Sequence, residues 1–183
     1  MNTKSNTSKL TLTALLTALA IVIPMVMPIK VVMPPFSATL ASHTPLIIAM
    51  FISPMAAVVT SFGSALGFLF SLGPVVAARA AMHVFFTLAG AIMIRQRRNI
   101  FLTVIATMVI HTLSDMGIVW IIATLFGMGN ILSQNTMGAA QLLIGIGTSI
   151  HHLVDYTIAV VIITPLSKVF SDMFGYNKKD LHI

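Results

Sequence analysis

Long apolar runs alternate with short polar breaks along the whole chain. Six such runs cover about residues 10–27, 43–53, 54–72, 74–95, 100–126 and 139–168. A helix of about 20 apolar residues crosses the hydrocarbon layer of a bilayer. The pattern therefore predicts an all-α integral membrane protein, with one domain over residues 1–183 and six transmembrane helices in one bundle. The run 43–53 is short for this layer, so we expect a tilted or partly buried helix there.

The break at residues 29–42 is too polar and too rich in proline to cross a membrane. Pro34 and Pro35 disfavour helix and hold the preceding residue in an extended conformation. We therefore expect an ordered loop on the outer side of the membrane. Two pairs of small residues, Ala14 with Ala18 and Gly63 with Gly67, have the spacing that lets transmembrane helices approach closely.

Composition agrees with the membrane class, because only 8% of the 183 residues are charged, against about 25% in soluble domains. The net charge of +6 gathers at the ends of the apolar runs. The basic residues there are Lys4, Lys9, Arg95, Arg97, Arg98, Lys178 and Lys179. Basic residues flanking membrane spans stay in the cytoplasm, which predicts cytoplasmic N- and C-termini in a cell membrane protein. The positive charge is thus explained by the orientation of the chain in a lipid bilayer, and we expect no binding of nucleic acid.

Several chemistries are absent from the sequence. The chain has no cysteine, which excludes disulfides, iron–sulfur clusters and thiolate metal sites. It has no GxSxG, HExxH or phosphate-binding loop, so we expect neither an enzyme nor a protein that hydrolyses ATP by itself. We also expect no cofactor.

Three of the apolar runs carry pairs of polar residues four positions apart. The pairs are Arg79 with His83, His111 with Asp115, and His151 with Asp155. Each pair lies on one face of its helix, and buried ionisable groups face the interior of a bundle, so these faces should converge. Arg79 costs about 2.5–3.5 kcal/mol at the centre of a membrane helix and needs a counter-charge, for which Asp115 and Asp155 are both available.

These groups predict a pocket for a small polar or anionic molecule. The guanidinium fork of Arg79 matches a carboxylate. The candidate substrate-binding residues are Arg79, His83, His111, His151 and Asp155, with Lys30 and His43 from the outer loop and its end. Two other interpretations remain open. The same groups could form a structural ion-pair network, or the two His–Asp pairs could bind a divalent metal ion.

The chain resembles the substrate-binding S components of energy-coupling factor vitamin transporters. The resemblance rests on a length of about 180 residues, six apolar runs with Ala14 and Ala18 in the first, a proline-rich outer loop and no nucleotide site. The resemblance implies a vitamin captured under the loop after the first helix, in a pocket lined by the last three helices. It also implies partners, namely a transmembrane coupling protein that contacts Ala14 and Ala18, and two ATPase subunits.

Within this family, the run from Pro34 to Pro54 is similar to the S components assigned to niacin. The resemblance implies niacin as the vitamin, while pantothenate, another carboxylate, fits Arg79 almost as well. A divalent-metal-binding membrane protein and a purely structural membrane subunit are the alternatives from other classes. The sequence leaves open whether the energising module is dedicated or shared.

Overall fold

The computed structural model describes residues 3–126 and 134–169, which form seven helices and one hairpin of two strands. The elements are α1 Thr3–Val26, β1 Lys30–Met33, β2 Phe36–Thr39, α2 Thr44–Ile52, α3 Pro54–Leu72, α4 Pro74–Ala81, α5 His83–Arg95, α6 Ile100–Leu125 and α7 Gln134–Val169. Within this part of the chain, five stretches are long and apolar enough to cross a membrane: Asn6–Val26, Pro54–Leu72, Pro74–Arg95, Ile100–Leu125 and Met137–Pro165. The protein is thus a multi-pass, α-helical membrane protein.

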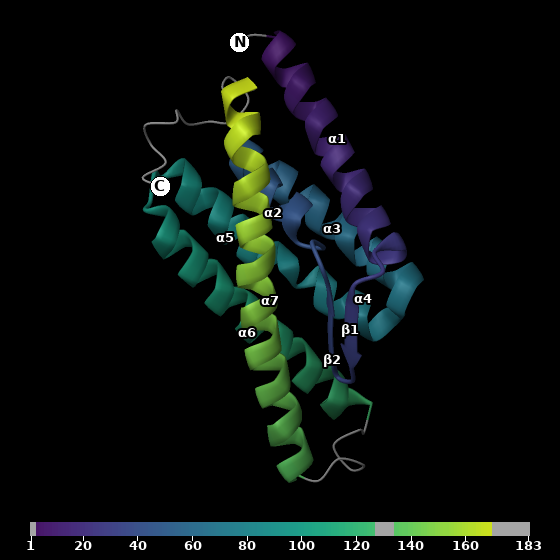
Figure 1. The fold of residues 1–183 in the computed structure, drawn as a ribbon. Coiled ribbons are helices and arrows are strands. Elements are labelled where there is room, and N and C mark those ends of the chain that lie inside the picture. The colour runs from purple at the N-terminus through teal and green to yellow at the C-terminus, as the bar shows by residue number, and fades with distance from the viewer. Residues whose placement is uncertain (1–2, 127–133, 170–183) are drawn as a thin grey trace.

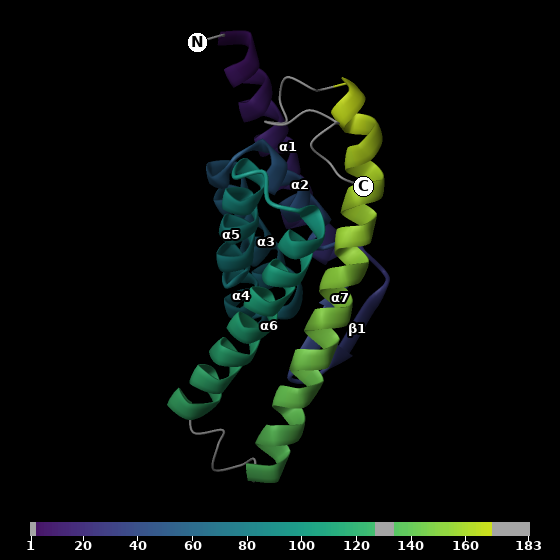
Figure 2. The same ribbon diagram turned by 90° about the vertical axis from the view of Figure 1, so that its left-hand side faces the viewer.

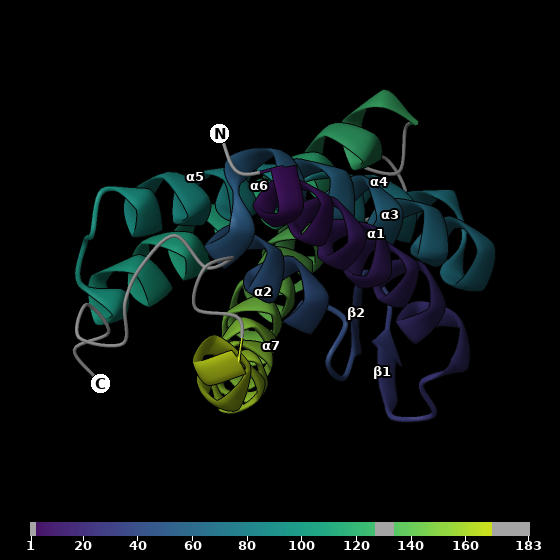
Figure 3. The ribbon, with the colours of Figure 1, turned by 90° about the horizontal axis from the view of Figure 1, so that it is seen from above.

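The helix α2 is the run that was expected to be a short second span. Its nine residues rise only about 14 Å, roughly half of the hydrocarbon layer. All nine are buried, and α2 lies between α1 and α7 when the molecule is seen from above (Figure 3). Its apolar composition therefore reflects burial inside the protein, and it is not one of the five long candidates.

The breaks between helices follow from local chemistry. Ser53 is extended, with φ −172° and ψ 160°, and its Oγ accepts a hydrogen bond of 3.0 Å from the backbone N–H of Ala56, which caps α3. Pro54 occupies the first turn of α3, where no backbone donor is needed. Gly73 separates α3 from α4 with φ 85°, a conformation that favours glycine.

Residues 29–42, expected to be an ordered loop, are ordered and contain a β-hairpin. β1 and β2 pair antiparallel, with Lys30 opposite Thr39 and Met33 opposite Phe36. Pro34 and Pro35 form the turn, where their missing N–H groups break no ladder hydrogen bond. The ring of Phe36 lies against Gly147 of α7, so close that a Cβ there would be 2.5–2.9 Å from ring atoms. The hairpin is therefore held against α7 (Figure 1).

α1 and α3 run parallel and in close contact. A Cβ at Gly63 would lie 2.7 Å from Cγ2 of Thr17, and one at Gly67 would collide with the backbone of Ile21. Because α1 and α3 point in the same direction, the segment that connects them must cross the molecule in the opposite direction. The hairpin and α2 make this crossing. The first turns of α1 and the last turns of α7 lie at the same end of the molecule (Figures 1 and 2).

Candidate functional site

A small cavity lies where α2 begins, enclosed by β2 and the facing sides of α3 to α7. Its volume is about 20 Å³, which is room for about one water molecule. The lining residues are Ser37, Ala38, Thr39, Ser42, His43, Phe68, Val76, Arg79, Ala80, His83, His111, Asp115, Thr148 and His151. Most of the side chains that line the cavity are polar.

The structure brings together most of the candidate residues named from the sequence. The five that line the cavity are His43, Arg79, His83, His111 and His151. Asp155 is fully buried and adjoins the cavity through His43. Lys30 lies apart, because its Nζ donates a hydrogen bond of 2.6 Å to the carbonyl of Pro24 near the end of α1.

Arg79 pairs with Asp115, one of the two carboxylates that the sequence left open. Its Nη2 lies 2.7 Å from Oδ2 of Asp115, which also accepts a hydrogen bond of 2.9 Å from Thr148. Its Nη1 donates to the carbonyl of Pro35 at 3.1 Å and to Oγ of Ser37 at 3.2 Å. Arg79 therefore links α4, α6 and the hairpin. Among the described residues, its Nε has no hydrogen-bond partner.

Asp155 accepts two hydrogen bonds from the backbone just before α2. Its Oδ1 accepts a hydrogen bond of 2.8 Å from the N–H of Ala41, and its Oδ2 accepts one of 2.8 Å from the N–H of His43. Ala41 has φ 63°, an unusual conformation for a residue with a side chain, which these bonds help to hold. The carboxylate also stabilises the positive end of the α2 dipole. Asp155 thus fixes where α2 begins.

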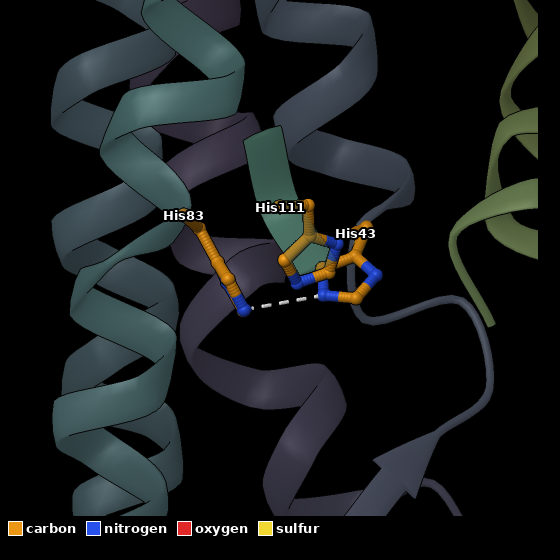
Figure 4. Close-up of side chains that lie close together, drawn as sticks. All are labelled: His43, His83 and His111. Carbon is orange, nitrogen blue, oxygen red and sulfur yellow. Dashed lines mark hydrogen bonds between the residues drawn. The ribbon is translucent and has the colours of Figure 1, made fainter. Parts of the chain in front are cut away.

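The histidine rings form one cluster around His43. Ring centroids lie 4.5 Å from His43 to His83, 4.7 Å to His111 and 4.5 Å to His151. Figure 4 shows His43, His83 and His111 converging from the start of α2, from α5 and from α6, with His43 Nε2 and His83 Nε2 3.3 Å apart. His43 Nδ1 lies 3.2 Å from Oδ2 of Asp155.

The site predicted from the sequence did not include five of the polar residues here, namely Ser37, Thr39, Ser42, Thr148 and His152. His152 is fully buried, with Nδ1 3.2 Å from His111 Nδ1. Thr148 and His152 lie four residues apart on the face of α7 that also carries Asp155, a helical spacing that could have identified them. Ser37 and Ser42 reach the cavity through the hairpin, whose pairing the apolar pattern does not reveal.

Comparison with known proteins supplies one curated relative. The chain is 33% identical to the niacin transporter NiaX of Lactococcus lactis subsp. cremoris (strain MG1363). The alignment extends over 183 positions and covers 96% of this chain and 82% of the relative. No family model and no solved structure matches. At this identity and coverage, the chain belongs to the family of that transporter, the niacin-type S components of energy-coupling factor vitamin transporters.

Proposed function

We propose that the protein captures nicotinate, a small carboxylate vitamin, at the outer side of the cell membrane for ATP-driven uptake by partner subunits. The observation that carries this proposal is the identity of 33% to a niacin transporter along nearly the whole chain. The cavity supports it, because a buried guanidinium and several imidazoles line one small cavity. As a member of a transporter family, the protein is not an enzyme.

In this proposal Arg79 recognises the carboxylate and the histidines complete the pocket. A charge-assisted hydrogen bond from a guanidinium to a carboxylate is stronger than one between neutral groups. The Nε of Arg79 has no partner in the described part of the chain, so it is available to such a ligand. His43, His83, His111 and His151 would contact the ring of the vitamin.

The cavity must expand to admit a vitamin. About 20 Å³ holds a water molecule, and a pyridine ring with a carboxylate is several times larger. The hairpin is the element we propose to move, because Arg79 holds it by two hydrogen bonds, to Pro35 and Ser37. A carboxylate that attracts Arg79 would compete with these bonds and with Asp115.

We further propose that the chain makes six passes with both termini in the cytoplasm, α2 and the hairpin together forming the second pass. Two observations support an even number. The first turns of α1 and the last turns of α7 lie at one end of the molecule, and α1 and α3 run in the same direction (Figure 2). The turn between α5 and α6 lies toward that same end and follows Arg95. Basic residues favour the cytoplasmic side.

Ala14 and Ala18 are the proposed contact for the transmembrane coupling protein, which would connect the chain to two ATPase subunits. Both are exposed on α1. They line an open, mostly apolar groove between α1 and the start of α3. Small side chains there would let a helix of the partner approach closely.

Isothermal titration of the purified full-length protein with nicotinate, nicotinamide and pantothenate tests the proposed substrate. We expect nicotinate to bind far more tightly than nicotinamide, which lacks the carboxylate. Arg79→Lys keeps the charge but loses the fork, and we expect it to weaken nicotinate binding about 10- to 100-fold. Arg98→Ala is the control, because Arg98 is exposed beyond the end of α5.

Each outcome of this titration decides a different part of the proposal. Binding of pantothenate alone would overturn niacin and keep a carboxylate vitamin. Equal binding of nicotinate and nicotinamide would overturn the role of Arg79. An absence of binding by all three would overturn the proposed function.

A further inference from the structure

We propose that His43, His83 and His111 form a binding site for a first-row divalent transition metal ion, with Zn²⁺ as the best fit. The three histidines each offer a ring nitrogen, and these atoms all lie within 4.8 Å of one another. Imidazole is a preferred ligand of Zn²⁺, Cu²⁺ and Ni²⁺. The metal site would share these three histidines with the proposed vitamin pocket, but the inference goes beyond vitamin binding and rests on the geometry of the rings alone.

The distance between two of the ligand atoms matches metal coordination. With metal–nitrogen bonds of 2.0–2.1 Å and a tetrahedral angle, two nitrogens on one Zn²⁺ lie about 3.3–3.4 Å apart. His43 Nε2 and His83 Nε2 are 3.3 Å apart. The ring of His111 faces both, with centroids 4.7 Å from His43 and 4.8 Å from His83 (Figure 4). A small rotation of His111 would complete the set.

The second nitrogen of two of these rings lies close to a neighbour, although within the described residues His43 Nδ1 makes no hydrogen bond. His43 Nδ1 faces the Asp155 carboxylate at 3.2 Å, and His111 Nδ1 lies 3.2 Å from His152 Nδ1. Metal-binding histidines almost always use their second nitrogen in this way, which fixes the ring and directs the other nitrogen at the metal. These contacts leave Nε2 of His43 and of His111 as the atoms that face His83.

Charge around the cluster favours a cation. Arg79 faces His83 from α4, but Asp115 neutralises it at 2.7 Å. Asp155, in contrast, is fully buried, and within the described residues its ionic contacts are with His43 and His151, with no lysine or arginine. A buried carboxylate without a full counter-charge is costly in a membrane protein. A divalent ion bound to His43 would supply the missing positive charge.

The cavity supplies room for a fourth ligand. All three histidines line the volume of about 20 Å³, which holds about one water molecule. Three protein ligands and one water is a common coordination of Zn²⁺. A second group that includes His43, with His151 and Asp155, fits less well, because both oxygens of Asp155 already accept backbone hydrogen bonds.

The test measures bound metal on full-length protein purified in detergent through a tag without histidine. The protein is equilibrated with ZnCl₂, passed over a desalting column and analysed by elemental mass spectrometry. We expect one zinc per chain in the wild type and in His151→Asn, and a loss of at least tenfold in occupancy in His83→Asn and His111→Asn. His151→Asn is the matched control, because it removes a ring from the same cavity and spares the triad.

The proposal would be overturned if the wild type held no more zinc per chain than His83→Asn. Loss of zinc in His151→Asn with retention in His83→Asn would also overturn it, in favour of the second group. Co²⁺ titration of the wild type tests the site without relying on the correct folding of any variant. The wild type should show the visible absorption of tetrahedral cobalt bound to nitrogen, and Zn²⁺ should reverse it. A wild-type spectrum of purely octahedral cobalt would contradict the site. Nicotinate titrations are read separately, so failure of either proposal is visible by itself.

Discussion

Asp155 shows how one buried side chain can determine the path of the backbone. Both of its oxygens accept backbone N–H groups, from Ala41 and from His43, at the entry to α2. The N–H of His43 is buried inside the protein, where a polar group without a partner is costly. The Asp155 carboxylate supplies an acceptor for this N–H and for that of Ala41, and so stabilises the start of α2.

Asp155→Asn should destabilise the protein for this reason. The amide keeps one accepting oxygen and turns an N–H donor toward a backbone N–H. We expect a loss of about 1–3 kcal/mol in the free energy of unfolding and a lower thermal midpoint in detergent. Thr157→Ala is the control on the same helix, because Thr157 is exposed and, within the described residues, its hydroxyl bonds only to the carbonyl of Leu153. An unchanged midpoint for Asp155→Asn would show that the entry to α2 is held by other contacts.

At the scale of elements, the contact between α1 and α3 depends on two glycines. Gly63 and Gly67 form one face of α3, and α1 lies directly on it through Thr17 and Ile21. Because α1 is mostly exposed in its membrane-crossing part, its contact with α3 fixes much of its position. The same helix carries Ala14 and Ala18 on the exposed side.

Gly67→Ala should displace α1. The added methyl group would collide with the backbone of Ile21, which cannot rotate away as a side chain can. We expect a destabilisation of about 1–3 kcal/mol, measured as a lower thermal midpoint. Gly117→Ala in α6 is the control, because a Cβ there meets nothing within 4 Å in the part of the chain that the structure describes. The better helix propensity of alanine should leave stability equal or higher. Equal midpoints for the two variants would contradict a tight contact between α1 and α3.

For the whole molecule, the proposed six-pass topology places three sites on defined sides. The chain has no cysteine, so single cysteines can be introduced without removing any. We expect Val32→Cys, exposed on the hairpin, to react with a membrane-impermeant maleimide on intact cells. Ser8→Cys and Gln96→Cys, both exposed, should react only after lysis. Labelling of either one in intact cells would contradict cytoplasmic placement of that end.

Local patterns in the sequence were enough to predict the membrane class, the approximate helices and the polar faces. Apolar runs and basic ends are local signals, and α3 covers the same residues, 54–72, as the predicted third run. The pairs Arg79 with His83 and His111 with Asp115 could be placed on one face each because helical periodicity is local. The relation to a transporter family also lies in the sequence, since it rests on identity along the chain.

How these polar faces combine depends on the packing of the helices, which no local pattern reveals. Asp115 and Asp155 are both aspartates in apolar helices, and their sequence neighbours do not reveal that one pairs with Arg79 and the other binds the backbone before α2. The apolar run 43–53 could not reveal that α2 is surrounded by protein, because burial in protein and in lipid select the same side chains. Likewise, the approach of His83 to His43, 40 residues apart, depends on the packing of separate elements.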